Sequence, residues 1–295
     1  MEWRSTVNEF LDSLRVKGAS ANTVVAYRND LIQFAAYLSA SLPEDAAWSN
    51  VTTDVIGTYV QGLVEQSYTA STIARKVAAL KTFFHWLTRC ELVAEDPTLE
   101  LRSPKVEKRT PRLLSEEEVN RLFDSASKMP PPRSLRDRAL LEVIYATGMR
   151  VSEAIALRLG DVDLENNTIR CVGRGTRQRT VPLTLQAAAA LRAYLDNARA
   201  DMVSNADTDF LFVNPLGSKL TRQAVWQLTR QHAQAAGIEG ELTPHTLRHS
   251  RAAHMLNNGE DIRRVQAWLG HANLATTQMY RPRTDKESNL MPLNP

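Results

Sequence analysis

The chain has 295 residues, of which 43% are hydrophobic and 23% are charged, and its formal net charge is +3. This composition is typical of globular proteins, and the length is enough for about two domains with buried cores. No apolar run approaches the roughly 18 residues that a membrane helix requires. The first residues, Met1 to Ser5, lack the basic and apolar regions of a signal peptide. We therefore expect a cytoplasmic protein with no membrane partner.

Neither the cysteines nor the net charge identifies a partner. Cys90 and Cys171 lie far apart in apolar contexts, so we expect two reduced thiols, each buried or half-buried. The basic side chains are concentrated in two runs, residues 102–112 and residues 170–179. Such runs are typical either of solvated loops or of segments that contact phosphates.

Residues 1–101 show the pattern of four short helices. Apolar residues recur at helical spacing in four segments, with a capping residue near the start of each. The segments are Val7–Leu14 after Ser5 or Thr6, Val24–Leu38 after Ser20 or Asn22, Val55–Leu63 after Thr53, and Ile73–Leu87 after Ser71. On the polar faces, Arg75, Lys76 and Lys81 are candidate DNA contacts, although solvated positions of this kind are common.

A basic linker is expected at residues 102–112. Its two prolines and five basic side chains disfavour a helix and cannot form a core. Lys105 and Lys108 in this linker are further candidate DNA contacts. The second domain, residues 113–295, begins with a capping box formed by Ser115 and Glu118.

One β-hairpin interrupts this second, otherwise helical domain. Residues 168–172 and 179–183 alternate as strands do, and residues 173–178 contain the glycines of a tight turn. Arg177 and Arg179 of the hairpin are candidate DNA contacts. Residues 210–213 form a further short strand candidate. The expected fold class is therefore mainly α, with a helical first domain and an α+β second domain.

Two side chains that suit a phosphate begin one helix of the second domain. Thr243 is a good N-cap and Pro244 a good first helical residue, and the helix is expected to run to Asn258. His245 and Arg248 then lie on one face of its first two turns. The free N–H groups of a helix start favour a phosphate, which Arg248 can bind with two parallel hydrogen bonds. The alternative is that His245 only caps and packs.

Arg150 is placed in a similar way. It follows a helix end and tight turn at Thr147 and Gly148, and it opens a helix expected over residues 151–157. Glu153 can pair with Arg150 and fix its orientation. A plain surface ion pair, which contributes little energy, is the alternative.

Tyr280 is the candidate nucleophile. His271 follows a helix end at Leu269 and Gly270, and Asn273 caps the short helix expected to carry Tyr280. A tyrosine hydroxyl has a pKa near 10, so it needs a base and a phosphate whose charge is neutralised. His245 is the expected base, and His271, Arg150 and Arg248 would stabilise the pentacoordinate transition state. The alternative is a packed core tyrosine.

Four motifs together resemble those of the tyrosine site-specific recombinases, the phage integrase family, and most closely its Xer branch. They are residues 146–153, 243–249, 269–271 and 276–280, and the resemblance runs from about Thr6 to Tyr280. It implies a four-helix, SAM-like core-binding domain at residues 1–101 and a catalytic domain at residues 113–295. It also implies cleavage of DNA through a 3′-phosphotyrosyl link, with no metal and no other cofactor.

The resemblance also implies partners. Members of the family act as tetramers on two double-stranded DNA sites, with identical subunits or with a paralogous recombinase. An Xer role would be the resolution of chromosome dimers at cell division, with a DNA translocase as a possible further partner. A mobile-element integrase is the alternative. Beyond Tyr280, the family pattern implies that Leu290, Met291 and Leu293 pack on a neighbouring protomer, and a disordered tail is the alternative.

Arg174 is the one departure from the family pattern. The hairpin turn of the family carries a lysine that protonates the leaving 5′-oxygen, whereas this chain has Gly173, Arg174 and Gly175. Arginine holds its proton too tightly to be a comparable acid. We expect Arg174 to act as an electrostatic substitute. A DNA-binding homologue with weak catalysis is the alternative.

A metal-dependent hydrolase is a further alternative, because His245 and His249 lie four residues apart and His271 supplies a third imidazole. The residue after the first histidine is Thr246, where the zinc pattern His-Glu-x-x-His has glutamate. The sequence therefore predicts no metal site.

Overall fold

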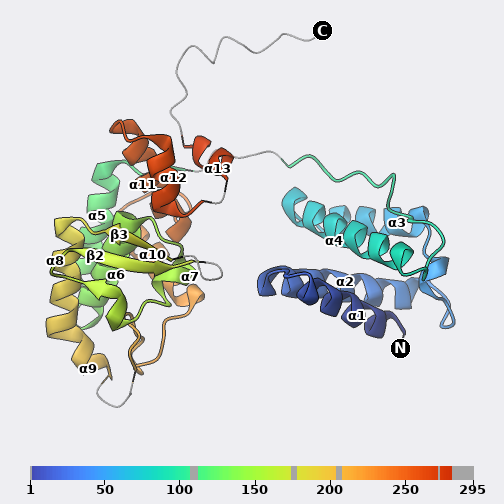
Figure 1. Ribbon diagram of the computed structural model, residues 1–295, viewed down its shortest axis with the longest axis horizontal. Helices are drawn as coiled ribbons and strands as arrows, with labels where there is room; N and C mark the ends of the chain where they lie inside the picture. Colours follow the sequence, from blue (N-terminus) through green and yellow to red (C-terminus); the bar gives the residue numbers. More distant parts are fainter. Residues whose placement is uncertain (1, 107–111, 174–177, 204–207, 272, 281–295) are drawn as a thin grey trace, which may run out of the picture. The chain divides into compact units, whose positions relative to one another are not determined.

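A computed structural model describes residues 2–106, 112–173, 178–203, 208–271 and 273–280 (Figure 1). The chain divides into two compact units, Met1–Arg109 and Thr110–Pro295. Within the described ranges, every helix is too short or too polar to cross a membrane.

Helices form the described part of the N-terminal unit. They are α1 (Glu2–Val16), α2 (Ala21–Ser41), the short 3-10 helix η1 (Trp48–Asn50), α3 (Thr53–Glu65) and α4 (Ala70–Arg89). Helix α1 packs on α2, and both α2 and α3 pack on α4 (Figure 1). The four helices predicted from apolar spacing are confirmed.

The helix starts differ from the prediction by a few residues. The N-caps of α3 and α4 are Thr52 and Thr69, one and two residues before the expected Thr53 and Ser71. In each case the earlier threonine accepts a hydrogen bond from a backbone N–H in the first turn, and this bond defines the cap. Helix α1 starts at Glu2, before the expected caps.

Aromatic side chains fill the core of the N-terminal unit. Phe10, Phe34, Trp48, Phe83 and Phe84 are all buried. Trp48 meets Phe83 edge to face, with ring centroids 4.7 Å apart, and Phe10 meets Phe83 in the same way at 5.2 Å. Such pairs add about 0.5–1.5 kcal/mol beyond the burial of their area, so this core holds the four helices together.

The C-terminal unit combines helices with a small sheet. Its described helices are α5 (Glu116–Ser127), α6 (Arg133–Thr147), α7 (Val151–Ala154), η2 (Leu159–Asp161), α8 (Leu185–Tyr194), η3 (Leu195–Arg199), α9 (Ala200–Val203), α10 (Arg222–Ala235), α11 (Pro244–Asn257), α12 (Ile262–Leu269) and α13 (Leu274–Gln278). Helix α6 is almost wholly buried and packs against α5, α8 and α11. Figure 1 shows α11, α12 and α13 together at one end of this unit.

The predicted hairpin forms strands β2 (Thr168–Val172) and β3 (Gln178–Pro182), and a two-residue strand β1 (Val162–Asp163) extends it. The three strands are antiparallel in the order β1-β2-β3. Ile169 pairs with Val181, and both side chains are buried. Cys171 is buried on the same face, whereas Cys90 is exposed, contrary to the prediction.

Two local predictions in this unit are wrong. Residues 210–213 do not form a strand, because Phe210 and Val213 make only isolated bridges, to Arg158 and to Lys219. Their apolar character instead reflects burial in the core. The helix expected over residues 151–157 ends at Ala154. The Leu157 carbonyl accepts from the Leu211 N–H at 2.8 Å, which draws the chain out of the helix.

Two hydrophobic clusters meet where the candidate site lies. The large core of the C-terminal unit is built around α6. A separate small cluster joins α11 to α12 and α13, and its members are Ala252, Ala253, Met255, Val265, Leu269 and Tyr280. The small cluster therefore positions the tyrosine, while the large core positions the elements that face it.

Candidate active site of the C-terminal unit

Arg150 projects from the junction of α6 and α7. Gly148 ends α6 in the left-handed conformation, with φ of 59°, and Arg150 is the N-cap of α7. The Arg150 backbone N–H donates to Glu153 Oε2 at 2.7 Å, and its Nη1 donates to Oε1 at 3.3 Å. The predicted pairing with Glu153 is confirmed, and it fixes both the main chain and the side chain of Arg150.

Glu153 is buried and also binds Arg179 from β3. The two Arg179 terminal nitrogens donate to the two Glu153 oxygens at 3.0 and 3.1 Å. Burial alone would raise the pKa of Glu153, but the hydrogen bonds from Arg179 and from the Arg150 backbone outweigh it and leave the pKa below its usual range. Glu153 is thus a buried carboxylate that aligns two arginines.

Arg248 is the most buried of the site arginines, with 3% of its surface exposed. Its Nη1 donates to the Gly148 carbonyl, and its Nη2 donates to the Leu269 carbonyl at 2.7 Å. Burial, followed by the charge of Arg150, lowers the pKa of Arg248 to about 10. The side chain therefore remains a cation at neutral pH.

The three arginines converge on the C-terminal end of α12. Arg179 Nε donates to the Trp268 carbonyl at 2.8 Å, Arg248 to the Leu269 carbonyl, and Arg150 to the Gly270 carbonyl at 3.4 Å. The last carbonyls of a helix lack partners within the helix and carry partial negative charge. Guanidinium groups satisfy these carbonyls here.

His271 and Tyr280 follow directly from this helix end. His271 Nδ1 shares a hydrogen bond of 2.9 Å with Thr277 Oγ1, which fixes the orientation of the ring. The rings of His271 and Tyr280 are stacked, with centroids 6.3 Å apart. Tyr280 itself lies in the turn after α13, two residues beyond the end of the helix that was expected to carry it.

Helix α11 carries two further imidazoles, of which His249 contacts Tyr280 and His245 contacts His249. The His249 ring centroid is 5.1 Å from that of Tyr280 and 6.3 Å from that of His245. Burial, followed by the charge of His245, lowers the pKa of His249 to about 4. Burial, followed by Arg248 and Arg150, also lowers the pKa of His245. Both rings are therefore neutral at pH 7.

The electrostatics of this arrangement suit a phosphodiester and an attacking hydroxyl. Arg150 and Arg179 share the carboxylate of Glu153, and Arg248 binds only backbone carbonyls, so positive charge is in excess beside Tyr280. Burial raises the pKa of Tyr280, while Arg248 opposes the rise, so the hydroxyl keeps its proton at neutral pH. A neutral histidine can accept that proton, and a phosphate bound by the arginines is the electrophile that the charges favour.

Comparisons with known proteins identify the family. The model of the phage integrase family matches residues 112–287, and that of the phage integrase N-terminal SAM-like domain matches residues 7–91. The chain is 46% identical to the tyrosine recombinase XerC of Roseiflexus sp. (strain RS-1) over 90% of this chain and 84% of that protein. The chain belongs to the phage integrase family. It is a site-specific tyrosine recombinase.

Other relatives agree with this assignment. The recombinase is 42% identical to the tyrosine recombinase XerD of Halalkalibacterium halodurans, over 94% of this chain and 92% of that protein. The solved structure of the XerH site-specific recombinase bound to its difH substrate, in a pre-cleavage complex, matches with a TM-score of 0.74 and 25% identity. That match covers 97% of this chain and 82% of XerH. The mainly helical two-domain fold class predicted for the recombinase is thus confirmed.

Two of the basic residues expected to contact DNA, Arg75 and Lys76 of α4, instead form ion pairs with Asp30 of α2. Lys76 is buried, and its Nζ donates to Asp30 Oδ1 at 3.0 Å and to the amide oxygen of Gln33. Arg75 pairs with the other oxygen of Asp30 but keeps an exposed side chain. Lys76 therefore holds α4 to α2 and does not lie on an open face.

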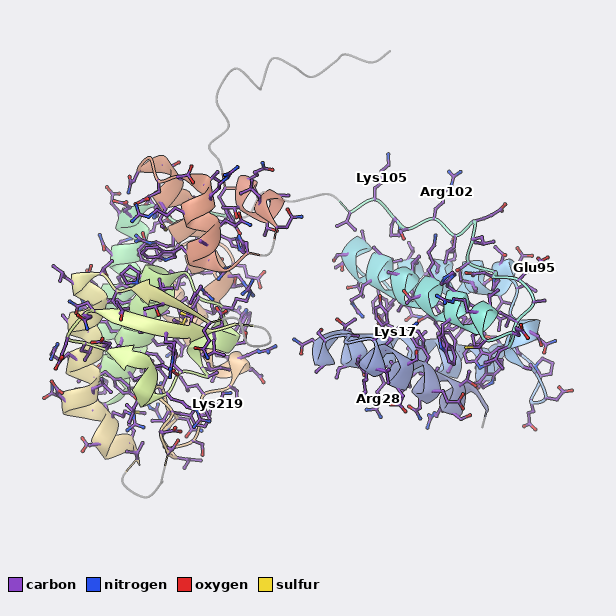
Figure 2. All side chains as sticks on the ribbon, in the orientation of Figure 1. Lys17, Arg28, Glu95, Arg102, Lys105 and Lys219 are labelled. Carbon is purple, nitrogen blue, oxygen red and sulfur yellow. The ribbon has the colours of Figure 1, made fainter. Side chains whose placement is uncertain are left out.

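Among the other basic residues of the N-terminal unit, Arg102 and Lys105 are exposed and Lys81 is half-buried. Lys81 and Arg102 line a shallow hollow with residues 99–101 and Ser103. Figure 2 shows the side chains of Arg102 and Lys105 extending away from the helices of this unit. Lys108, Arg174, Arg177, Leu290, Met291 and Leu293 lie outside the described residues.

Two contacts of the recombinase site differ from the sequence-based expectations. His249 was considered only as a metal ligand, yet its ring lies beside Tyr280. Arg179 was assigned to DNA, yet it binds Glu153 and α12. The position of His249 directly after Arg248, in the first two turns of α11, was a usable signal. In the described ranges, no group of three or more His, Cys, Asp or Glu side chains is placed to hold a metal ion.

Proposed function

We propose that this recombinase cuts and rejoins DNA strands through a covalent link to Tyr280. The Tyr280 oxygen attacks the phosphorus and forms a 3′-phosphotyrosyl ester, while the bond from phosphorus to the 5′-oxygen breaks. His245 accepts the tyrosine proton. A 5′-hydroxyl of another strand then attacks the ester, so that no external energy source is needed. The observation that carries this proposal is the placement of Tyr280 beside the imidazoles of His249 and His271 and near Arg248.

The other site residues stabilise the charge that develops on phosphorus. Arg150 and Arg248 bind the non-bridging phosphate oxygens, and His271 donates a further hydrogen bond. Removing one such donor typically costs a factor of about 100–1,000 in rate. Arg174 offsets charge on the leaving 5′-oxygen, and water supplies the proton that arginine holds too tightly to give.

We also propose how the chain divides its work. Residues 1–101 bind the DNA core site, residues 102–112 connect the units, and residues 113–295 carry the catalysis. The DNA contacts are Arg75, Lys81, Lys105, Lys108 and Arg177. The family matches at residues 7–91 and 112–287 support this division, and the exposure of Lys105 supports a phosphate contact there.

The biological role that we propose is Xer-type resolution of chromosome dimers at cell division. Identities of 46% to an XerC and 42% to an XerD support it. The assembly would be a tetramer on two double-stranded DNA sites, with identical subunits or with a paralogous recombinase, and a DNA translocase at the division site would control it. Recombination of a plasmid with two candidate chromosomal sites, with and without the paralogue, tests this role.

A suicide-substrate assay tests the chemistry. Purified protein is mixed with nicked DNA that carries candidate sites, and covalent complexes are separated on a denaturing gel. We expect a protein–DNA adduct that is absent in Tyr280→Phe and insensitive to EDTA. Tight specific binding without an adduct would instead support a DNA-binding homologue with a silent site, and an adduct abolished by EDTA would support a metal-dependent mechanism.

A further inference from the structure

The guanidinium group of Arg179 joins two parts of the active site, Glu153 of α7 and the end of α12. Its Nη1 and Nη2 donate to the two oxygens of Glu153 at 3.0 and 3.1 Å, and its Nε donates to the Trp268 carbonyl at 2.8 Å. The side chain is 15% exposed, so it offers little surface to a ligand. Arginine alone among the side chains has the planar set of donors that makes these three bonds at once.

Each partner of Arg179 leads to a residue of the chemistry. Glu153 accepts hydrogen bonds from the backbone and side chain of Arg150 and so fixes that arginine. Trp268 lies in the last turn of α12, three residues before His271. Arg179 of β3 therefore contacts Glu153, which holds Arg150. It also contacts the end of α12, which precedes His271 and Tyr280.

We infer that Arg179 is a positioning residue of the cleavage reaction, which holds Arg150 and the α12–α13 segment in one geometry. The inference rests on the function proposed above, and it replaces the expectation that Arg179 contacts DNA. Arg179 acts through Glu153 and through the end of α12, and it touches neither the phosphate nor the nucleophile.

The packing around α12 explains why such a support is needed. Tyr280 and Leu269 belong to the small cluster with α11, which is separate from the main core. Apolar contacts thus join α12 and α13 mainly to α11, while Arg179 ties the end of α12 to the sheet. A displacement of about 1 Å at a reacting group can cost a factor of about 100 in rate.

Gly270 lies against the guanidinium group of Arg179, where a larger residue would crowd it. A Cβ atom at Gly270 would lie 3.1 Å from Arg179 Nη1 and 3.3 Å from its Cζ, closer than ordinary contact. Gly270 also has φ of 65°, which favours glycine. The absent side chain leaves the space that Arg179 occupies against the end of α12.

Arg179→Gln tests the inference, with Arg192→Gln as the matched control. Arg192 is an exposed arginine of α8 whose guanidinium donates only to the Leu164 carbonyl among the described contacts. We expect Arg179→Gln to lower the rate of covalent-complex formation by about 10- to 100-fold, with DNA affinity within about twofold of wild type. We expect Arg192→Gln to match wild type in both measurements.

Two further measurements separate positioning from general stability and from acid catalysis. Hydrogen exchange should become faster in peptides from α12 of Arg179→Gln, with the exchange of α5 unchanged. A substrate with sulfur as the leaving atom should not rescue Arg179→Gln, because the defect lies in alignment and not in protonation of the leaving group. If Arg179→Gln does not fold, Arg179→Lys should fold, retain part of the ion pair, and cleave at an intermediate rate.

The outcomes are distinguishable. Absence of an adduct with the wild-type protein would refute the proposed function itself. A wild-type adduct with undiminished cleavage by Arg179→Gln would refute only the positioning role. Equal losses of DNA affinity and cleavage would assign Arg179 to DNA contact, and rescue by the sulfur substrate would assign it to leaving-group protonation. Either result would also overturn the inference.

Discussion

Glu153 shows how one buried carboxylate can organise a cationic site. It lies 6% exposed between Arg150 and Arg179, and its charge allows the guanidinium groups to lie close together beside Tyr280. Loss of one partner from a buried pair leaves an uncompensated charge and typically costs about 3–5 kcal/mol. The site is therefore sensitive to Glu153 even though this residue does not bind substrate.

Arg174 provides a test at the level of one side chain. Arg174→Ala should lower strand cleavage by at least about 10-fold and change DNA affinity little, because we propose that the guanidinium stabilises the leaving 5′-oxygen. Rates on an ordinary substrate and on one with a sulfur leaving atom measure this, and we expect the sulfur substrate to restore cleavage. Equal losses of binding and cleavage would mean that Arg174 is only a phosphate contact.

The buried histidines predict a dependence of stability on pH. His249 and His271 each have a pKa lowered to about 4 in the folded protein, chiefly by burial, against about 6.5 in an unfolded chain. Between these values the unfolded chain binds more protons, so acidification from pH 6.5 to 4 lowers the free energy of unfolding.

Thermal unfolding of wild type and of a His249→Gln, His271→Gln double variant across this range measures the effect. The melting temperature of the double variant should fall less steeply with decreasing pH. The same slope in both proteins would show that these two histidines do not titrate as their burial requires.

At the level of helices and strands, local sequence signals were the most reliable. The Ser115–Glu118 capping box, the Thr243 and Asn273 caps and the presence of the hairpin all follow from residues close in the chain. The prediction of a strand at residues 210–213 was wrong because an apolar run indicates that a segment is buried but does not show that it pairs with another strand. Contacts across the fold, such as that of Arg179 with Trp268, leave no periodic signal.

Gly270 tests the helix end that the arginines bind. Gly270→Ala and the control Gly237→Ala place alanine at nearly the same positive φ, 65° and 64°, so both should lose about 1–2 kcal/mol of stability. Only Gly270 faces Arg179, whereas nothing lies within 4 Å of a Cβ at Gly237. Cleavage should therefore fall more than about fivefold in Gly270→Ala alone, and equal cleavage by the two variants would contradict the account.

On the scale of the whole molecule, the sequence indicated two units and their fold class, but it did not show which lysine of α4 is buried in an ion pair. Helical spacing places Lys76 and Lys81 on polar positions of one helix. Only the fold reveals that Asp30 of α2 lies opposite Lys76. Burial of that pair depends on how α2 packs on α4, which involves residues 46 positions apart in the chain.

These two lysines give a prediction for the N-terminal unit. Lys76→Met leaves buried Asp30 with Arg75 as its remaining cationic partner, and the lost hydrogen bond should lower the free energy of unfolding by about 1–3 kcal/mol. Lys81→Met should leave stability within about 0.5 kcal/mol. It should instead reduce the slope of log affinity for DNA against log salt by about 0.9, as expected for one lost phosphate contact.

Denaturant unfolding and DNA binding at several salt concentrations distinguish the two variants. The assignment of Lys76 to structure would be refuted by a stable Lys76→Met protein with weakened DNA binding. An unchanged salt slope in Lys81→Met would remove Lys81 from the proposed DNA contacts.

The most direct test of the central claim is to identify the atom that joins protein to DNA in the trapped complex. Mass spectrometry of the digested adduct should find the DNA on Tyr280, linked through a 3′-phosphate, with a free 5′-hydroxyl on the released strand. An adduct on another residue, or a link through a 5′-phosphate, would contradict the assignment of Tyr280 and of the cationic site around it.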